Sequence, residues 1–402
     1  MSVYKLEPVL AHIDANIEIA TAHLFDLLRI PSISTDPNFK VDCDKAADWL
    51  VQDLKSIGFD ASKRTTPGHP MVLAHAGDAG THLMFYGHYD VQPVDPLDLW
   101  DSPPFEPVLE PGDLGPVIRA RGSSDDKGQL MTFVEACRAW KAVHGNLPGK
   151  ISLFFEGEEE SGSPSLVPFM TENSAELTAD IALICDTGLF GNNTPGIVTR
   201  LRGMLGEELT ITGPSKDLHS GMYGGAAINP ARILARIIST LHDDTGRITI
   251  PEFYDGVPEL SPEMIEQWDG LNFDSAGFLD QVGLSELAGE QGRTALEMIW
   301  SRPTCEVNGI WGGYTSLGFK TVLPGQASAK ISFRLVGKQD PNKIRDNFRA
   351  MVQSMLPPDC SVKFTSHGSS EGSEMALENQ AFEAARVALS DEWPEAAAFV
   401  GC

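Results

Sequence analysis

Four clusters of acidic and histidine side chains each follow a short apolar run in the first half of the chain. The runs are Leu83–Tyr86, Val117–Ala120, Ile151–Phe155 and Ile181–Cys185, and they lead into the segments GHYD, GSSDDKG, EGEEESG and D. Such runs alternating with helical stretches predict an α/β fold with a mostly parallel sheet covered by helices. Because ligand sites in open α/β sheets lie beyond the carboxyl ends of the strands, we expect the clusters to meet at one rim.

The pattern changes after about residue 200. Residues 204–212 and 330–336 alternate between apolar and polar side chains, whereas 229–241 and 341–355 have helical spacing. Antiparallel strands with helices on one side are typical of an α+β domain, which we place at 200–370. A last predicted helix indicates a return to the first domain, so that domain is expected to be discontinuous, spanning 1–199 and 371–402.

The composition excludes several classes of partner. Among 402 residues, 30 Lys and Arg face 56 Asp and Glu, which gives a net charge of −26. Binding to nucleic acid or to an anionic membrane requires clustered basic residues, and the sequence has no such cluster. Six cysteines without a CxxC pair indicate reduced thiols. The first residues lack the pattern of a signal peptide, and no run reaches the roughly 18 apolar residues of a membrane span. We therefore expect a cytoplasmic protein.

The four clusters together point to a metal centre. Taken singly, each has an ordinary explanation as a solvated turn, a strand end or the start of a helix, where acidic side chains are favoured. Placed together, the carboxylates would repel one another, and one or two divalent cations would remove that cost. Imidazole and carboxylate ligands without thiolate suit zinc, manganese or cobalt.

Two neighbouring cations require one bridging carboxylate and separate terminal ligands. Asp125, at the start of a helix, is the natural bridge. His88 and Asp186 would then hold one metal, and Glu160 the other.

Two further acids of the clusters have no ligand role in this scheme. Asp90 lies two residues after His88 and can accept the other ring N–H of that histidine. Glu159 is adjacent to a ligand and can act as the general base that takes a proton from water.

The motifs GHYDVQP, RGSSDDKG, FEGEEESG and CDTG, in this order and spacing, resemble those of the dinuclear metallo-exopeptidases and amidohydrolases. That family includes carboxypeptidase G, acetylornithine deacetylase, succinyl-diaminopimelate desuccinylase and the carnosinase-like cytosolic dipeptidases. The resemblance implies metal ligation by His88, Asp125, Glu160 and Asp186, a general base at Glu159 and an orienting acid at Asp90. It also implies that Asp125 precedes a cis peptide bond to Asp126.

The second half of the chain resembles the carnosinase-like branch. The segment KDLHSG is similar to a lid motif whose histidine, here His219, reaches the partner subunit's active site and stabilises the oxyanion. The segments KTVLP and ISFR place Thr321 and Arg334 at substrate-binding positions, with the arginine taking a C-terminal carboxylate. From the residues alone, a turn role for His219 and an ion pair on a lid strand for Arg334 remain open.

The sequence departs from the family pattern near its end. The family's last metal ligand is a histidine that follows a Gly-Gly-Ser loop, and neither occurs before Cys402. His367 lies in the segment SHGSSEG, which does not match that motif. We therefore expect a chain truncated by a final strand and helix, which holds its second metal weakly.

Taken together, the sequence predicts a metal-dependent hydrolase that cleaves the amide bond of dipeptides. Two divalent ions would serve it, Zn²⁺ foremost, with Mn²⁺ or Co²⁺ as alternatives. The expected partners are a small peptide substrate and a second copy of the chain bound through a lid and dimerisation domain at 200–370. Two alternatives stay open: a deacylase of N-acyl amino acids of the desuccinylase or deacetylase type, and a non-catalytic metal-binding homologue.

Overall fold

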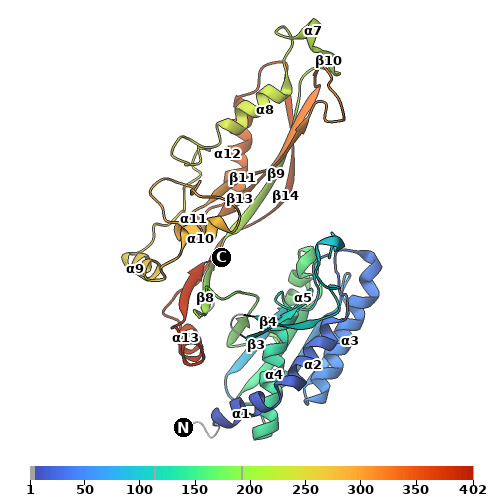
Figure 1. The fold of residues 1–402 in the computed structure, drawn as a ribbon, viewed down its shortest axis with the longest axis vertical. Coiled ribbons are helices and arrows are strands. Elements are labelled where there is room, and N and C mark those ends of the chain that lie inside the picture. The colour runs from blue at the N-terminus through green and yellow to red at the C-terminus, as the bar shows by residue number, and fades with distance from the viewer. Residues whose placement is uncertain (1–4, 113–114, 192, 402) are drawn as a thin grey trace. The chain divides into compact units, whose positions relative to one another are not determined.

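The computed structural model describes residues 5–112, 115–191 and 193–401. The chain forms two compact units, Met1–Gly188 and Leu189–Cys402. Figure 1 shows the elements of each unit. In the described part of the chain, no helix is long and apolar enough to span a membrane.

A five-stranded sheet forms the centre of the first unit, in the strand order β1-β2-β6-β3-β7. Its strands are β1 (Asp60–Arg64), β2 (Met71–Ala76), β3 (His82–His88), β6 (Lys150–Glu156) and β7 (Ile181–Ile184). β3 pairs parallel with both β6 and β7, whereas β2 pairs antiparallel with β1 and β6. The strands that precede three of the clusters are thus parallel, and their carboxyl ends share one edge of the sheet.

The strand predicted before the remaining cluster lies outside this sheet. Among the described residues, β5 (Gly115–Arg119) pairs only with β4 (Val108–Gly112), in a separate antiparallel hairpin. The expectation that all four clusters follow strands of one sheet was therefore wrong for this cluster. Pro111 and Pro116 oppose each other in the hairpin, and proline cannot donate the hydrogen bonds of a central strand.

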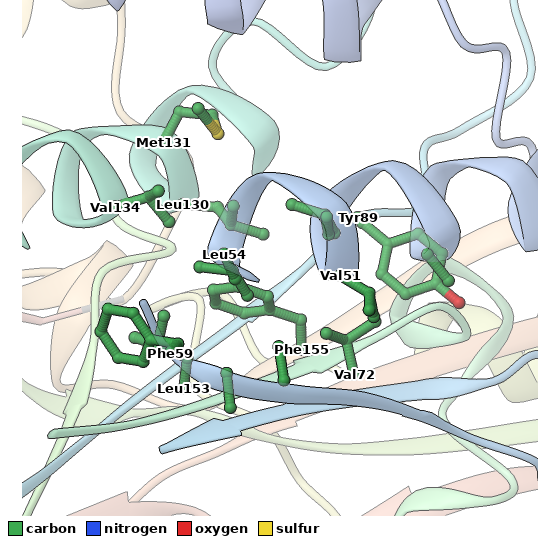
Figure 2. Packing of buried hydrophobic residues seen from close by; sticks show 14 of the residues in the cluster. Val51, Leu54, Phe59, Val72, Tyr89, Leu130, Met131, Val134, Leu153 and Phe155 are labelled. Carbon is green, nitrogen blue, oxygen red and sulfur yellow. The ribbon is translucent and has the colours of Figure 1, made fainter. Parts of the chain in front are cut away.

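Helices cover both faces of the five-stranded sheet. The helices of this unit are α1 (Glu7–Ala15), α2 (Ile17–Leu28), α3 (Lys40–Ser56), α4 (Lys127–His144), α5 (Leu166–Glu172) and α6 (Ser174–Leu177), with single turns at η1 (Pro37–Phe39), η2 (Leu97–Leu99) and η3 (Glu159–Ser161). Figure 2 shows Leu54 of α3 and Leu130 of α4 near Phe155 of β6, all three in one buried cluster. On the opposite face, Phe154 stacks on Phe169 of α5. Successive side chains of β6 thus serve two cores, as the period of a strand requires.

The second unit contains a four-stranded antiparallel sheet in the order β11-β13-β9-β14. Its strands are β9 (Gly203–Thr212), β11 (Thr304–Gly312), β13 (Gln326–Leu335) and β14 (Ser361–Ser370). Helices α8 (Pro230–Ser239) and α12 (Pro341–Ser354) share a buried cluster with it, in which Leu234 and Phe348 join Leu209 and Ile331. The predicted α+β architecture with antiparallel strands is confirmed here.

A smaller sheet joins the two ends of the second unit. Here β8 (Gly196–Leu201) pairs antiparallel with β15 (Ser373–Glu374) and parallel with β16 (Ala398–Gly401). The predicted last helix is α13 (Gln380–Glu392). The remaining elements are β10 (Leu218–His219), α7 (Ser220–Tyr223), α9 (Pro262–Gly270), α10 (Ser275–Asp280), α11 (Ala295–Trp300) and β12 (Val322–Leu323). The discontinuous domain of 1–199 and 371–402 stays a prediction.

Candidate metal centre

The first unit brings three of the predicted ligands into one cluster. His88 is the last residue of β3, Asp186 follows β7, and Asp125 lies just before α4. One ligand atom of each residue lies within 4.8 Å of the others. The shared edge of β3 and β7 explains why His88 and Asp186 meet, and the segment that enters α4 brings Asp125 to them. Glu160 is not part of this three-residue cluster.

His88 is completely buried and its two ring nitrogens have different surroundings. Nε2 lies 3.1 Å from Oδ1 of Asp125 and 3.5 Å from Oδ2 of Asp186. Nδ1 lies 3.1 Å from the backbone oxygen of Asp90 and 3.4 Å from its Oδ1. An N–H donated from Nδ1 leaves the Nε2 lone pair facing the two carboxylates, which is the arrangement of a metal-binding histidine.

The charges around His88 test whether a cation fits between these groups. Burial lowers the pKa of His88, but hydrogen bonds to Asp125, Asp186 and Asp90 outweigh burial and raise the pKa well above its ordinary value. The carboxylates thus stabilise a positive charge next to Nε2, whether a proton or a metal ion supplies it. Imidazole and carboxylate oxygen are a donor set that suits a divalent cation, so the residues fit the predicted metal.

Asp90 fastens the neighbouring turn as well as the histidine. Its side chain is completely buried, and its carboxylate accepts hydrogen bonds from the backbone N–H groups of Glu159 at 3.2 Å and Glu160 at 3.1 Å. Both residues belong to η3, the turn that follows β6. A single buried acid therefore sets the positions of His88, of the candidate base and of the fourth candidate ligand.

Asp125 and Asp126 are joined by a cis peptide bond, as the resemblance implied. Asp125 is the exposed member, with 60% of its side chain accessible. Asp126 is buried, and its Oδ2 accepts the backbone N–H of His88 at 3.0 Å. Burial raises the pKa of Asp126 to about 7. The first aspartate thus faces the site, while the second holds the end of β3.

Glu159 and Glu160 differ in their side-chain contacts. The Glu159 carboxylate has no hydrogen-bond partner in the described ranges, whereas Oε2 of Glu160 accepts the side-chain N–H of Gln92 at 2.5 Å. Burial raises the pKa of both glutamates, and the negative charge of Asp125 raises them further. A free carboxylate with a raised pKa suits a general base.

Sequence reasoning missed two buried acids in the same segment. Glu158 accepts the backbone N–H of His69 at 2.9 Å and that of Ser165 at 3.1 Å. Glu156 accepts the hydroxyl groups of Ser163 and Tyr86. Glu156 and Glu158 therefore anchor the turn from below and leave Glu159 and Glu160 to face the site. One signal in the sequence could have indicated the role of Glu156. It is the last residue of β6, and the even-numbered residues of that strand point away from the core that α3 and α4 cover.

The second unit brings two predicted substrate-binding residues together. Nε2 of His219 lies 3.5 Å from Oγ1 of Thr321, and the Thr321 carbonyl accepts the N–H of Ser220 at 3.0 Å. Nδ1 of His219 accepts the N–H of Gly221 at 3.0 Å, which starts the short helix α7. His219 thus does serve a turn, and that role leaves its exposed Nε2 beside a hydroxyl.

Arg334 lies on β13, opposite Thr304 of β11 and Met204 of β9. Its side chain is exposed. Across the described residues it forms no ion pair, so the interpretation of Arg334 as half of a salt bridge on the lid strand finds no partner.

Comparisons with known proteins agree on a family. The model of a peptidase dimerisation domain matches residues 199–360. The Cys-Gly metallodipeptidase dug1 of Schizosaccharomyces pombe is 31% identical over 358 residues, which cover 86% of this chain and 74% of that protein. The human Beta-Ala-His dipeptidase is 27% identical over 82% of this chain and 68% of its own length.

A solved structure supports the same assignment. The M20 family metallo-carboxypeptidase of Sulfolobus solfataricus superimposes with a TM-score of 0.82 at 32% identity, over 95% of this chain and 85% of that one. The similarity to this structure covers both the α/β unit with the candidate metal ligands and the dimerisation domain. The chain belongs to the M20 family of metallopeptidases, in the branch of the Cys-Gly and Beta-Ala-His dipeptidases.

Proposed function

We propose that this protein is a dinuclear metallodipeptidase that hydrolyses the amide bond of dipeptides. The observation that carries the proposal is the buried His88, whose Nδ1 faces Asp90 while its Nε2 faces Asp125 and Asp186. The relatives support the substrate class, since two of them are named for Cys-Gly and Beta-Ala-His dipeptides.

The metal ligands are proposed residue by residue. His88 and Asp186 would hold one divalent ion, Asp125 would bridge, and Glu160 would hold the second. Zn²⁺ is the proposed metal, with Mn²⁺ or Co²⁺ as alternatives for this donor set. Bound there, the ions would polarise the substrate carbonyl and acidify a water molecule. The expected weak binding of the second ion, through Asp125 and Glu160 without a histidine, stays a prediction.

Glu159 would move the proton. Its carboxylate is free of hydrogen bonds among the described residues, and burial raises its pKa. It can therefore take a proton from the attacking water and return it to the leaving amine, which requires a base of intermediate strength.

The second unit would bind the rest of the substrate. The guanidinium of Arg334 is exposed and has no ion-pair partner among the described residues, so it can donate a bidentate pair of hydrogen bonds to the C-terminal carboxylate of a dipeptide. His219 would donate a hydrogen bond to the oxyanion, and Thr321, which lies beside it, would bind the substrate. Of these residues, His219 would act in the active site of a second copy of the chain.

The two edges of the four-stranded sheet support a particular mode of dimerisation. At the β11 edge, Ile310 and Trp311 are exposed, and the loop that follows carries Leu317 and Phe319, which are 101% and 92% exposed. The β14 edge ends in the polar sequence SHGSS, with no large apolar side chain. Burial of exposed apolar side chains stabilises association, so we propose that β11 and its loop form the homodimer contact.

The free state of the described cysteines supports the predicted cytoplasmic location, where thiols stay reduced.

Hydrolysis assays test the function directly. Protein stripped of metal and reloaded with Zn²⁺ or Mn²⁺ would be given free dipeptides, longer peptides and N-acetyl and N-succinyl amino acids. Cleavage of dipeptides is expected. Cleavage of the acylated amino acids alone would make the protein a deacylase, and cation binding without any turnover would favour the non-catalytic homologue.

A further inference from the structure

Gln92 makes a contact at the metal centre that the proposed mechanism does not use. It lies in the segment GHYDVQP, two residues after Asp90, and its side chain is exposed. Nevertheless its Nε2 donates to Oε2 of Glu160 at 2.5 Å. Fixing an exposed glutamine in one rotamer costs conformational entropy, so the surrounding structure must favour this contact.

The backbone on both sides of Gln92 is fixed. Val91 is completely buried, and its N–H donates to the carbonyl of Ser32 at 3.0 Å. The carbonyl of Pro93 accepts a hydrogen bond from Nη2 of Arg121 at 3.0 Å. The side chain of Gln92 therefore starts from a backbone position that the first unit determines.

A second layer of contacts holds Arg121 itself. Its guanidinium lies over the ring of Trp100 at 5.2 Å, and the indole N–H donates to the carbonyl of Val94 at 2.9 Å. Arg121 and Trp100 thus clamp the loop after β3, in which Gln92 lies. Arg121 also belongs to the segment that leads to Asp125, so the clamp connects two parts of the candidate centre.

We propose that Gln92 is a positioning residue for Glu160, an inference that rests on the proposed function. The amide of Gln92 donates a hydrogen bond to one carboxylate oxygen of Glu160, and the other oxygen stays available to the second cation. A neutral donor suits this role, because it orients the carboxylate without cancelling the charge that attracts the cation. Asp90 holds the backbone N–H of Glu160 and Gln92 holds its side chain. One five-residue segment therefore carries the ligand of the first cation, His88, and fixes the ligand of the second.

The test is a titration of the metal-stripped protein with Co²⁺, followed by visible absorption, for the wild type and for Gln92→Met. Methionine keeps the size of the side chain and removes the donor. We expect the affinity for the second Co²⁺, the one that Glu160 would hold, to fall by about tenfold to a hundredfold, as for other groups that orient a metal ligand. The first step, at His88 and Asp186, should keep its affinity. With saturating metal, kcat for a dipeptide should fall while KM changes little.

Two further variants make the result specific. Gln92→Asn keeps the amide on a shorter side chain and should behave like Gln92→Met. Gln52→Met, on the exposed face of α3, should bind Co²⁺ as the wild type does. Unchanged binding by Gln92→Met, or an equal loss at both steps with a lowered melting temperature, would overturn the positioning role alone. A wild-type chain that binds no divalent cation would overturn the proposed function, and this inference with it.

Discussion

The candidate groups of the two units differ in how many of them are buried and in the contacts that hold them. In the first unit, His88 and Asp90 are completely buried, and Glu159 and Glu160 have their backbone N–H groups bonded to Asp90. In the second unit, the candidate groups are exposed. Arg334 has no ion-pair partner among the described residues.

This difference separates two kinds of functional side chain. Groups that must hold a cation have to be fixed before it arrives, because a loose carboxylate loses affinity. Groups that meet a substrate or a second subunit can stay exposed, since their partner supplies the remaining contacts. The first unit should therefore bind metal without help, whereas the second should act only with a ligand or another copy of the chain.

The largest expected effect belongs to Glu159→Gln. This change keeps the size of the side chain and removes its ability to accept a proton, so turnover of a dipeptide should fall by about 10²–10⁴-fold. Metal content, measured by mass spectrometry of the purified protein, should remain that of the wild type. Turnover at the wild-type rate would rule out Glu159 as the base.

Disruption of the β11 edge should show how far the second unit depends on a partner. Trp311→Glu places a charge among the exposed apolar side chains of this edge, and we expect it to convert a dimer to a monomer in light scattering. Because His219 would then reach no partner active site, dipeptide turnover should fall by roughly 10²-fold, the scale of losing an oxyanion donor. Cation binding should persist.

The matched control for this edge is Ser369→Glu on β14, the other edge of the same sheet. It should leave both the dimer and the activity unchanged. A dimer that survives Trp311→Glu and dissociates in Ser369→Glu would contradict a contact at β11 and place it at the β14 edge.

Removal of the Arg334 charge should have an intermediate effect. With Arg334→Leu, kcat/KM for a free dipeptide should fall by about tenfold to a hundredfold, the equivalent of a charged hydrogen-bonded pair. The C-terminal amide of the same dipeptide, which lacks the carboxylate, should be hydrolysed equally slowly by both proteins. Retained discrimination between acid and amide in Arg334→Leu would show that another group binds the carboxylate.

The chemistry of the centre was predictable from sequence because its signals are local. Carboxylates and a histidine at the ends of apolar runs indicate one rim of a sheet, and His88, Asp125 and Asp186 do meet there. Asp90 could be inferred from its spacing to His88. Glu158 could not, since its partner His69 lies 89 residues away, and nothing in the sequence marks that contact.

The fold was predictable at the level of classes and less so for single strands. The α/β and α+β halves follow from the change in periodicity near residue 200. The run 117–120 was assigned to the central sheet because a short apolar run does not reveal its pairing partner. The role of Gln92 could not be predicted from the sequence for another reason. A neutral amide does not indicate a metal site or an acid–base role, and its position depends on the loop that Arg121 and Trp100 hold.

The smallest expected effect concerns a second histidine of β3, at the opposite end of the strand from His88. Nε2 of His82 contacts Oγ of Ser152 at 2.6 Å, and the same hydroxyl contacts Nδ1 of His75 at 2.8 Å. Burial, together with the charge of Lys150, lowers the pKa of His82. The unfolded chain therefore binds a proton at higher pH than the folded one, so the free energy of unfolding should decrease as the pH falls through the ordinary histidine value of about 6.5.

His82→Gln tests this dependence, because glutamine retains a hydrogen-bonding group and does not titrate. Urea unfolding at pH 7.5 and at pH 5 should give a smaller loss of stability for the variant than for the wild type, by about 1 kcal/mol or less. The difference between the two proteins isolates the contribution of His82 and of the groups that its replacement affects. Equal losses would mean that the proton affinity of His82 is unchanged by folding, and that this end of β3, unlike the end at His88, carries no histidine whose charge the fold controls.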